Sequence, residues 1–279
     1  MKVSEVMTRD PVALKVPGTR NELFELIKKT NQTSFPVLKA GSRKLVGIVT
    51  ETDIVHNPSE TQIALLMTRK PVTTSPDTEI GKVIEILLEN KFRQLPVVEN
   101  EELIGIVTIG DIISKVLAIT STEKTIERYM TDFVLGIWQE TPVLVCQKTM
   151  EFACVESAII FDDEAKMVGI ITNVDFVKFF EAISSEQRSE MSTGEGKEGS
   201  WDAVSTLIVH RKELTLPKLP VKKMMTKEVV TTFRKATISD VAKKMRKMSF
   251  YQMPVVDAKG NVIGMIRDAD LLQAYLSEI

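Results

Sequence analysis

The sequence has few of the residues that most catalytic and metal sites use. It contains two cysteines and two histidines. Neither histidine, His56 or His210, lies beside a nucleophile motif, and no P-loop or metal-ligand cluster is evident. The sequence therefore predicts no catalytic residues, no metal site and a protein that is not an enzyme. Cys146 and Cys154 lie in one helical-looking stretch without other ligand residues, so we expect buried free thiols in a reducing compartment.

Long apolar runs and an excess of one charge are also missing. No run approaches the 18 apolar residues of a membrane span, and the N-terminus has no apolar signal region, so we expect a soluble, cytoplasmic protein. The formal net charge is −2, which argues against a nucleic-acid partner because such domains carry a clustered basic excess. One basic cluster, at residues 243–247, has helical spacing and predicts a solvated helix face.

What the sequence does contain is a fourfold repeat, which decides the fold argument before any other feature. The dipeptide Met-Thr opens each copy, at Met7-Thr8, Met67-Thr68, Met130-Thr131 and Met225-Thr226. Near its end each copy has a glycine followed by two apolar residues, with an aspartate six positions after the glycine. The segments are Gly47–Asp53, Gly105–Asp111, Gly169–Asp175 and Gly264–Asp270.

The second copy shows the expected order of elements most clearly. Apolar residues recur at helical period across residues 80–88, and two apolar runs at 95–98 and 103–108 predict strands. A closing helix is expected over residues 112–119. The same order in the other copies predicts a mixed α/β (α+β) fold built from β-α-β-β-α units.

The third copy departs from the pattern. Its first central strand is Ala158–Phe161 instead of a Leu-Pro-Val-Val run, and its closing helix is expected over 176–183. Residues 184–200, rich in Ser, Gly and Glu, predict a mobile linker. Residues 207–209 and 214–216 predict the two strands of a small hairpin.

Each unit of about 60 residues buries too little of its own surface to be comfortably stable alone, so the units are expected to pair. We expect a first module over residues 1–120, with repeats 1–58 and 60–120. The second module covers 121–279, with repeats 124–184 and 219–279 around a linker and insertion at 185–218.

With these markers in register four times, the chain resembles the CBS-domain family, in which two CBS motifs pack about a pseudo-twofold into a Bateman module. The resemblance covers all but about residues 185–222. It implies four CBS repeats in two Bateman modules that bind adenosine-containing ligands (AMP, ADP, ATP or S-adenosylmethionine) in clefts between paired repeats.

The Thr-x-x-Asp junction between second strand and closing helix has two compatible interpretations. Threonine at the N-cap with an acidic residue three positions on is a good helix start. A carboxylate there can also accept hydrogen bonds from a ribose diol, and the hydroxyl can meet a phosphate. The resemblance assigns ligand contacts to Thr50, Asp53, Thr108, Asp111, Thr172 and Asp175, and in repeat 4 to Asp270, with Arg267 in place of the hydroxyl.

The residue three positions before the strand proline separates the four sites. In the family a basic residue here reaches phosphates, and repeat 2 has Arg93, which can pair a phosphate bidentately. The other repeats have Thr33, Glu156 and Tyr251. We expect repeat 2 to be the best site, repeats 1 and 4 intermediate, and repeat 3 the poorest, because Glu156 repels phosphate. Arg93 as a plain surface charge is the alternative.

Together these features predict a non-catalytic regulatory sensor of adenosine-containing ligands, without a catalytic cofactor. The sensor is expected to act on an unidentified protein partner. The sequence is compatible with a homodimer. A structural scaffold with non-functional ligand sites is the alternative.

Overall fold

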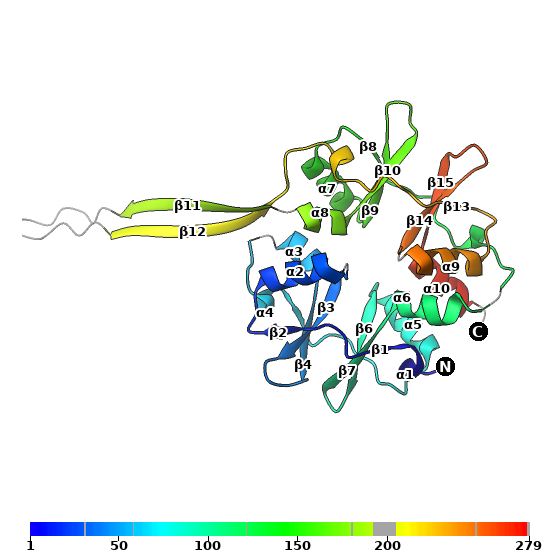
Figure 1. Ribbon diagram of the computed structural model, residues 1–279, viewed down its shortest axis with the longest axis horizontal. Helices are drawn as coiled ribbons and strands as arrows, with labels where there is room; N and C mark the ends of the chain where they lie inside the picture. Colours follow the sequence, from blue (N-terminus) through cyan, green and yellow to red (C-terminus); the bar gives the residue numbers. More distant parts are fainter. Residues whose placement is uncertain are drawn as a thin grey trace, which may run out of the picture.

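The computed structural model describes residues 1–30, 32–57, 59–120, 122–179, 181–191, 205–248 and 250–277. The chain has the expected mixed α+β fold, with small sheets and short helices arranged as repeats around a common centre (Figure 1). Within the described ranges no helix is long and apolar enough to cross a membrane.

The first two repeats contain the predicted elements. Repeat 1 comprises α1 (Val3–Val6), β1 (Thr8–Arg9), β2 (Leu14–Val16), α2 (Arg20–Thr30), β3 (Ser34–Lys39), β4 (Leu45–Thr50) and α3 (Glu51–His56). Repeat 2 comprises α4 (Ile63–Leu66), β5 (Thr68–Arg69), α5 (Ile80–Glu89), β6 (Gln94–Glu99), β7 (Glu102–Thr108), α6 (Ile109–Ile112) and the π-helical turn η1 (Ile113–Leu117). The strand expected before α5 is reduced to a bridge between Thr74 and Val97.

The other two repeats have the same order. Repeat 3 comprises the 3-10 turn η2 (Ile126–Arg128), β8 (Gly136–Trp138), α7 (Val143–Phe152), β9 (Ser157–Phe161), β10 (Met167–Thr172) and α8 (Asn173–Phe179). Repeat 4 comprises the 3-10 turn η3 (Val221–Lys223), β13 (Thr232–Phe233), α9 (Ile238–Met248), β14 (Gln252–Val256), β15 (Val262–Arg267) and α10 (Asp268–Leu276). The degenerate third copy therefore keeps the fold of the others.

Paired repeats exchange their Met-Thr segments. Strand β1 of repeat 1 pairs with β7 of repeat 2, while β5 of repeat 2 pairs with β4 of repeat 1. Repeats 3 and 4 make the same exchange through bridges from Thr131 to Met265 and from Thr226 to Ile170. These pairings agree with the expected grouping of the repeats, and the module boundaries near residue 120 stay a prediction.

The exchange explains why a methionine and a glycine recur in every copy. Each Met-Thr methionine packs on the glycine of the paired repeat's second central strand, where any Cβ would collide with it. The four pairs are Met67 on Gly47, Met7 on Gly105, Met225 on Gly169 and Met130 on Gly264. Because the methionine fills the space that a Cβ would need, the two residues depend on each other.

The two pairs meet through their helices. Helices α9 and α10 of repeat 4 pack against α5, α6 and η1 of repeat 2, and one apolar core runs through both repeats. Repeats 1 and 3 have separate cores and meet through α3 and α8. The closing helix of repeat 2 is therefore buried between two pairs, which explains its apolar sequence.

The insertion differs from its prediction. Strands β11 (Glu181–Met191) and β12 (Ser205–Thr215) pair antiparallel over their whole length, and the arm they form extends away from the repeats (Figure 1). The prediction of a small hairpin at residues 207–216 is wrong, because all but the last of these residues lie in the single strand β12. Part of the expected linker, 184–191, is the partner strand, and 192–200 lies outside the described residues. The polar 184–191 carries no apolar alternation, and its strand forms by pairing with a distant segment.

Two local expectations are also wrong. The closing helix of repeat 3 ends at Phe179, and the chain is extended from Glu181. Cys146 is a buried free thiol as expected, but Cys154 is exposed. Cys154 follows the end of α7 and has a left-handed backbone (φ 53°), so the helical period that suggested burial no longer applies there.

Replacing Gly105 with alanine is expected to lower the free energy of unfolding by about 1–3 kcal/mol, the range for overpacking. The new Cβ would lie 2.8 Å from Met7 Sδ and 3.0 Å from the Thr8 carbonyl oxygen. Gly81→Ala in α5 is the matched control. Its Cβ meets no atom within 4 Å, so it should stabilise the helix by about 0.5–1 kcal/mol. Urea unfolding measures both, and the same loss in each variant would contradict the exchanged contact.

Replacing Thr232 with valine is expected to raise the free energy of unfolding by about 1 kcal/mol. Its side chain is fully buried in β13, and its hydroxyl has no hydrogen-bond partner among the described residues. Valine keeps the shape and removes an unsatisfied polar group, which costs about 1–3 kcal/mol when buried. Thr231→Val, at a half-buried neighbour, should change little. A destabilised Thr232→Val in thermal unfolding would mean that the hydroxyl has a partner.

Candidate functional site

The helix-capping role of the Thr-x-x-Asp junction is present in repeats 1, 2 and 3. Each aspartate Oδ2 accepts hydrogen bonds from the backbone N–H and the hydroxyl of the threonine three residues earlier. The pairs are Thr50 with Asp53, Thr108 with Asp111, and Thr172 with Asp175. In repeat 4 Asp270 accepts from the backbone N–H of Arg267. These contacts order the carboxylates whether or not a ligand binds.

In the described part of the chain, three cavities are formed by segments of paired repeats, and each is also bordered by a repeat of the other pair. The first, of about 430 Å³, holds Thr108 and Asp111 of repeat 2 together with the segment that follows Met-Thr in repeat 1. The second, of about 530 Å³, holds Thr172 and Asp175 of repeat 3 with the equivalent segment of repeat 4. The third, of about 300 Å³, includes Arg267.

The predicted site residues are thus only partly brought together. Arg93 borders all three cavities, and Arg267 borders the second and third. Thr50 and Asp53 border none of them, although their neighbour Glu51 lies in the second. Asp270 caps α10 and borders none of the three cavities, and burial raises its pKa.

The first two cavities have equivalent apolar walls. The first is lined by Val12, Pro36 and Ile106, and the second has Val230, Pro254 and Ile170 at the same repeat positions. Both also include Phe250 and Tyr251. An apolar slot with a carboxylate at one end is the composition expected of a small-molecule pocket.

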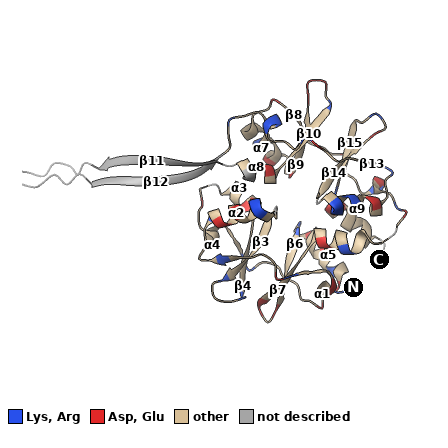
Figure 2. Ribbon diagram, viewed as in Figure 1, with Lys and Arg blue, Asp and Glu red and all other residues tan. Residues whose placement is uncertain are grey.

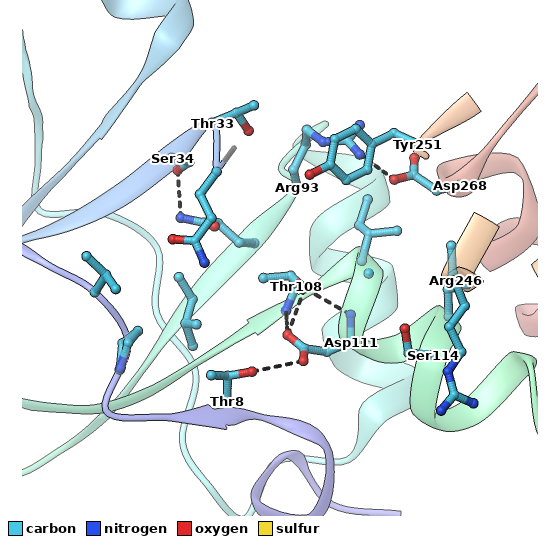
Figure 3. A pocket seen from close by; sticks show the side chains of 18 of the residues that line it. Thr8, Thr33, Ser34, Arg93, Thr108, Asp111, Ser114, Arg246, Tyr251 and Asp268 are labelled. Carbon is cyan, nitrogen blue, oxygen red and sulfur yellow. Dashed lines mark hydrogen bonds and ion pairs between the residues drawn. The ribbon is translucent and has the colours of Figure 1, made fainter. Parts of the chain in front are cut away.

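Asp111 is more heavily bonded than the sequence suggested. Besides the two cap bonds to Oδ2, its Oδ1 accepts from the Thr8 hydroxyl at 3.0 Å and from Lys115 Nζ at 3.0 Å. Figure 3 shows the bonds to Thr108 and Thr8. A carboxylate offers about four acceptor positions, so all are occupied. The lysine is particular to repeat 2. The residues at that position in repeats 1, 3 and 4 are Asn57, Phe179 and Ala274.

Arg93 lies where the four repeats converge. Its guanidinium is ion-paired to Asp268 of repeat 4, lies 3.8 Å from a Glu156 oxygen of repeat 3, and stacks 4.5 Å from the Tyr251 ring centre. Figure 3 shows the Tyr251 ring over the arginine and the ion pair from the arginine to Asp268. The sequence predicted a phosphate contact or a surface charge, but the arginine is partly buried and its charge is already paired. Its role toward a ligand stays a prediction.

The convergence follows from the repeat itself. In each copy the residue before the first central strand accepts a backbone hydrogen bond from the residue that follows the second central strand. The four pairs are Thr33 with Glu51, Arg93 with Ile109, Glu156 with Asn173, and Tyr251 with Asp268. These four equivalent pairs contribute one cation, three carboxyl groups and one phenol, all of which line the second cavity.

The two innermost carboxyl groups have raised pKa values. Burial raises the pKa of Asp268 to about 6, while the Arg93 guanidinium acts in the opposite direction. Burial, with the charge of Glu156, raises the pKa of Glu51 to about 8. Burial therefore disfavours the charged form of both carboxyl groups, and in Asp268 the ion pair with Arg93 opposes it.

Sequence reasoning missed one cation of the first cavity. Arg246 of α9 lines it from repeat 4, on the same side as Ser114 (Figure 3). The sequence placed this arginine on a solvated basic face, and the lysines and arginine of that helix do colour it blue in Figure 2. Helical spacing gives the face of α9 but not the neighbour that it meets, so no local signal could have assigned Arg246 to a cavity of repeats 1 and 2.

Within the described ranges, no cluster of three or more His, Cys, Asp or Glu side chains is arranged to hold a metal ion.

Two solved structures share the architecture. An uncharacterized conserved protein from Pyrococcus horikoshii is 27% identical and covers 98% of this chain and 99% of its own, with a TM-score of 0.65. Protein MJ1225 from Methanocaldococcus jannaschii is 19% identical, with 99% of this chain and 100% of its own covered and a TM-score of 0.78. The second likeness is one of fold alone.

The sequence comparison gives the family. The uncharacterized protein MJ0188 from Methanocaldococcus jannaschii is 36% identical over 127 residues, which are 44% of this chain and 47% of that relative. This chain therefore matches about half the length of that relative. The CBS domain model matches residues 3–60, 62–118 and 221–277, more than half of the chain, and leaves out the degenerate third repeat. On that match, and on the fold, this chain belongs to the CBS-domain family.

Proposed function

We propose that this protein is a non-catalytic sensor that binds adenosine-containing ligands in the clefts between its paired repeats. The observation that carries the proposal is the repetition of one arrangement in two cavities. Each places a Thr-x-x-Asp junction beside the exchanged Met-Thr segment and an apolar slot of matching residues. Cavities of about 430 and 530 Å³ lie within the range of small-molecule sites.

The chemistry of each wall suits a different part of such a ligand. The apolar slot suits a purine face, and the aspartate can accept the ribose hydroxyls as charge-assisted hydrogen bonds. In the first cavity Arg246 and Ser114 suit a phosphate, since guanidinium groups pair phosphate oxygens. AMP, ADP, ATP and S-adenosylmethionine all carry the adenosine part, and the common site is proposed for that part.

The clefts also suggest how binding would be sensed. Arg246 of repeat 4 borders the cleft of repeats 1 and 2, and Glu51 of repeat 1 borders the cleft of repeats 3 and 4. A ligand that contacts both pairs favours the packing in which these contacts form. We propose that residues 1–120 and 121–279 act as two modules, and that a cytoplasmic protein partner responds to their arrangement.

A structural scaffold is the second candidate, and one observation favours it. The Asp111 carboxylate is fully hydrogen-bonded within the protein, as expected of a site that no longer takes a ligand. Titration calorimetry with adenosine, AMP, ATP and S-adenosylmethionine separates the two candidates. Saturable binding supports the sensor, and no heat with any of the four supports the scaffold.

Asp175→Asn is expected to weaken adenosine binding in the second cavity ten- to a hundredfold. Loss of a hydrogen bond to a charged group costs about 1.5–3 kcal/mol, which corresponds to that factor. Asp163→Asn removes a carboxylate of the same repeat that borders none of the three cavities and serves as control. Calorimetry measures both variants, and equal affinities would remove Asp175 as the ribose contact.

Lys115→Met is expected to lower the dissociation constant of an adenosine-containing ligand in the first cavity about three- to tenfold. The substitution frees one acceptor position on Asp111 Oδ1, so a ribose hydroxyl no longer has to displace an ammonium group. Lys82→Met, at an exposed lysine of α5, should leave the affinity unchanged. Weaker binding in Lys115→Met would show that the lysine itself contacts the ligand.

A further inference from the structure

The charges in the second cavity are unbalanced. Five carboxyl groups line it against two guanidinium groups: Glu51, Glu156, Asp175, Glu228 and Asp268 against Arg93 and Arg267. Arg93 is already ion-paired to Asp268 and lies 3.8 Å from a Glu156 oxygen, and Arg267 lies 3.9 Å from Asp270 outside the cavity. The remaining carboxyl groups therefore exceed the cations available to a ligand.

The first cavity differs in this respect. It holds three carboxylates, and each has a cation within ion-pair distance. Asp10 pairs with Arg43 at 2.8 Å, Asp111 with Lys115 at 3.0 Å, and Asp268 with Arg93. Arg246 adds a further guanidinium to its lining. The two cavities thus share apolar walls and a Thr-x-x-Asp junction but differ in their charged linings, with three carboxyl and two guanidinium groups in the first and five and two in the second.

Glu51 adds to the difference between the two cavities. It begins α3 in repeat 1 and borders the cavity of the other pair, because α3 packs against α8. The charged groups near it are Arg93, Glu156, Asp53 and the Tyr251 phenol. Burial and the charge of Glu156 raise its pKa to about 8, despite the opposing effect of Arg93. A phosphate dianion placed here would meet Glu156 and Glu228 as like charges, whereas a cation would allow Glu51 to ionise.

We infer that the cavity of repeats 3 and 4 takes an adenosine-type ligand whose 5′ substituent carries positive charge, an ammonium or a sulfonium, and excludes one whose 5′ substituent is a phosphate. This inference rests on the proposed function, since it assumes that Asp175 and the apolar slot hold the adenosine part. The ribose on Asp175 leaves the wall formed by Glu51 and Glu156 for the 5′ substituent. Ligand charge, rather than the purine, then distinguishes the two clefts of the protein.

Three probes with the same purine and ribose test the inference: adenosine, AMP, and 5′-dimethylsulfonio-5′-deoxyadenosine, whose charge does not titrate. Calorimetry uses the full chain and its Asp175→Asn variant, and the binding lost in the variant is assigned to this cavity. The sulfonium is expected to bind there at least tenfold more tightly than AMP at pH 7.5. AMP binding as tightly or more tightly there would overturn the inference and leave the proposed function standing. No binding by any of the three would overturn both.

The pH dependence gives a second readout. Between pH 6.5 and 8.5 Glu51 changes from mostly protonated to mostly ionised, so sulfonium affinity should rise about fivefold and adenosine affinity should not. Glu51→Gln should remove the rise, and Glu85→Gln, at an exposed position of α5, should keep it. Glu156→Gln, at a side chain that is 72% exposed, should weaken sulfonium binding without risk to folding. A pH profile that Glu51→Gln leaves unchanged, with Glu156→Gln also without effect, would contradict the acidic wall.

Discussion

The exchanged contact between a methionine of one repeat and a glycine of its partner is the constraint on which the rest of the structure depends. It occurs four times, and each time the methionine occupies the space of the missing Cβ. The contact fixes the chain that follows Met-Thr beside the Thr-x-x-Asp junction of the other repeat. The clefts are made by that placement, so neither repeat of a pair could form its cleft alone.

A second consequence of the repeat appears at the centre of the molecule. Four equivalent backbone hydrogen bonds hold Thr33, Arg93, Glu156 and Tyr251 at the same position in each repeat, and all four line the second cavity although their side chains have nothing in common. Symmetry fixes the backbone, and the side chains are free to differ. The single arginine therefore pairs with an acidic neighbour of another repeat, and the second cavity keeps more carboxyl than guanidinium groups in its lining. We attribute different ligand preferences to the two clefts on this basis.

The fold could be predicted from the sequence because its signals are local and occur in register. The helical period of residues 80–88 and the two apolar runs after it correspond to α5, β6 and β7. The arm formed by β11 and β12 could not be predicted, because the polar strand 184–191 carries no period of its own. Its extended conformation depends on a partner strand that starts fourteen positions after Met191, at Ser205.

The site was predictable only as far as the repeat motif reaches. Thr108, Asp111, Thr172 and Asp175 lie beside cavities, whereas Thr50 and Asp53 border none of the three described. Contacts between the two pairs of repeats could not be predicted from the sequence. The Lys115–Asp111 ion pair has i,i+4 spacing and was within reach of the sequence, but nothing local indicates that Arg93 meets Asp268 or that Arg246 borders a cleft of the other pair. Each of the last two depends on how two pairs pack, which composition and period do not specify.

The most direct test of the central claim is a crystal structure of the full chain with adenosine bound at saturating concentration. The account predicts adenosine in the cavity of repeats 3 and 4, with its purine against Val230 and Pro254. Its ribose hydroxyls should lie within hydrogen-bond distance, about 2.5–3.0 Å, of the Asp175 carboxylate. Adenosine bound elsewhere on the molecule, or with its ribose turned away from Asp175, would contradict the account.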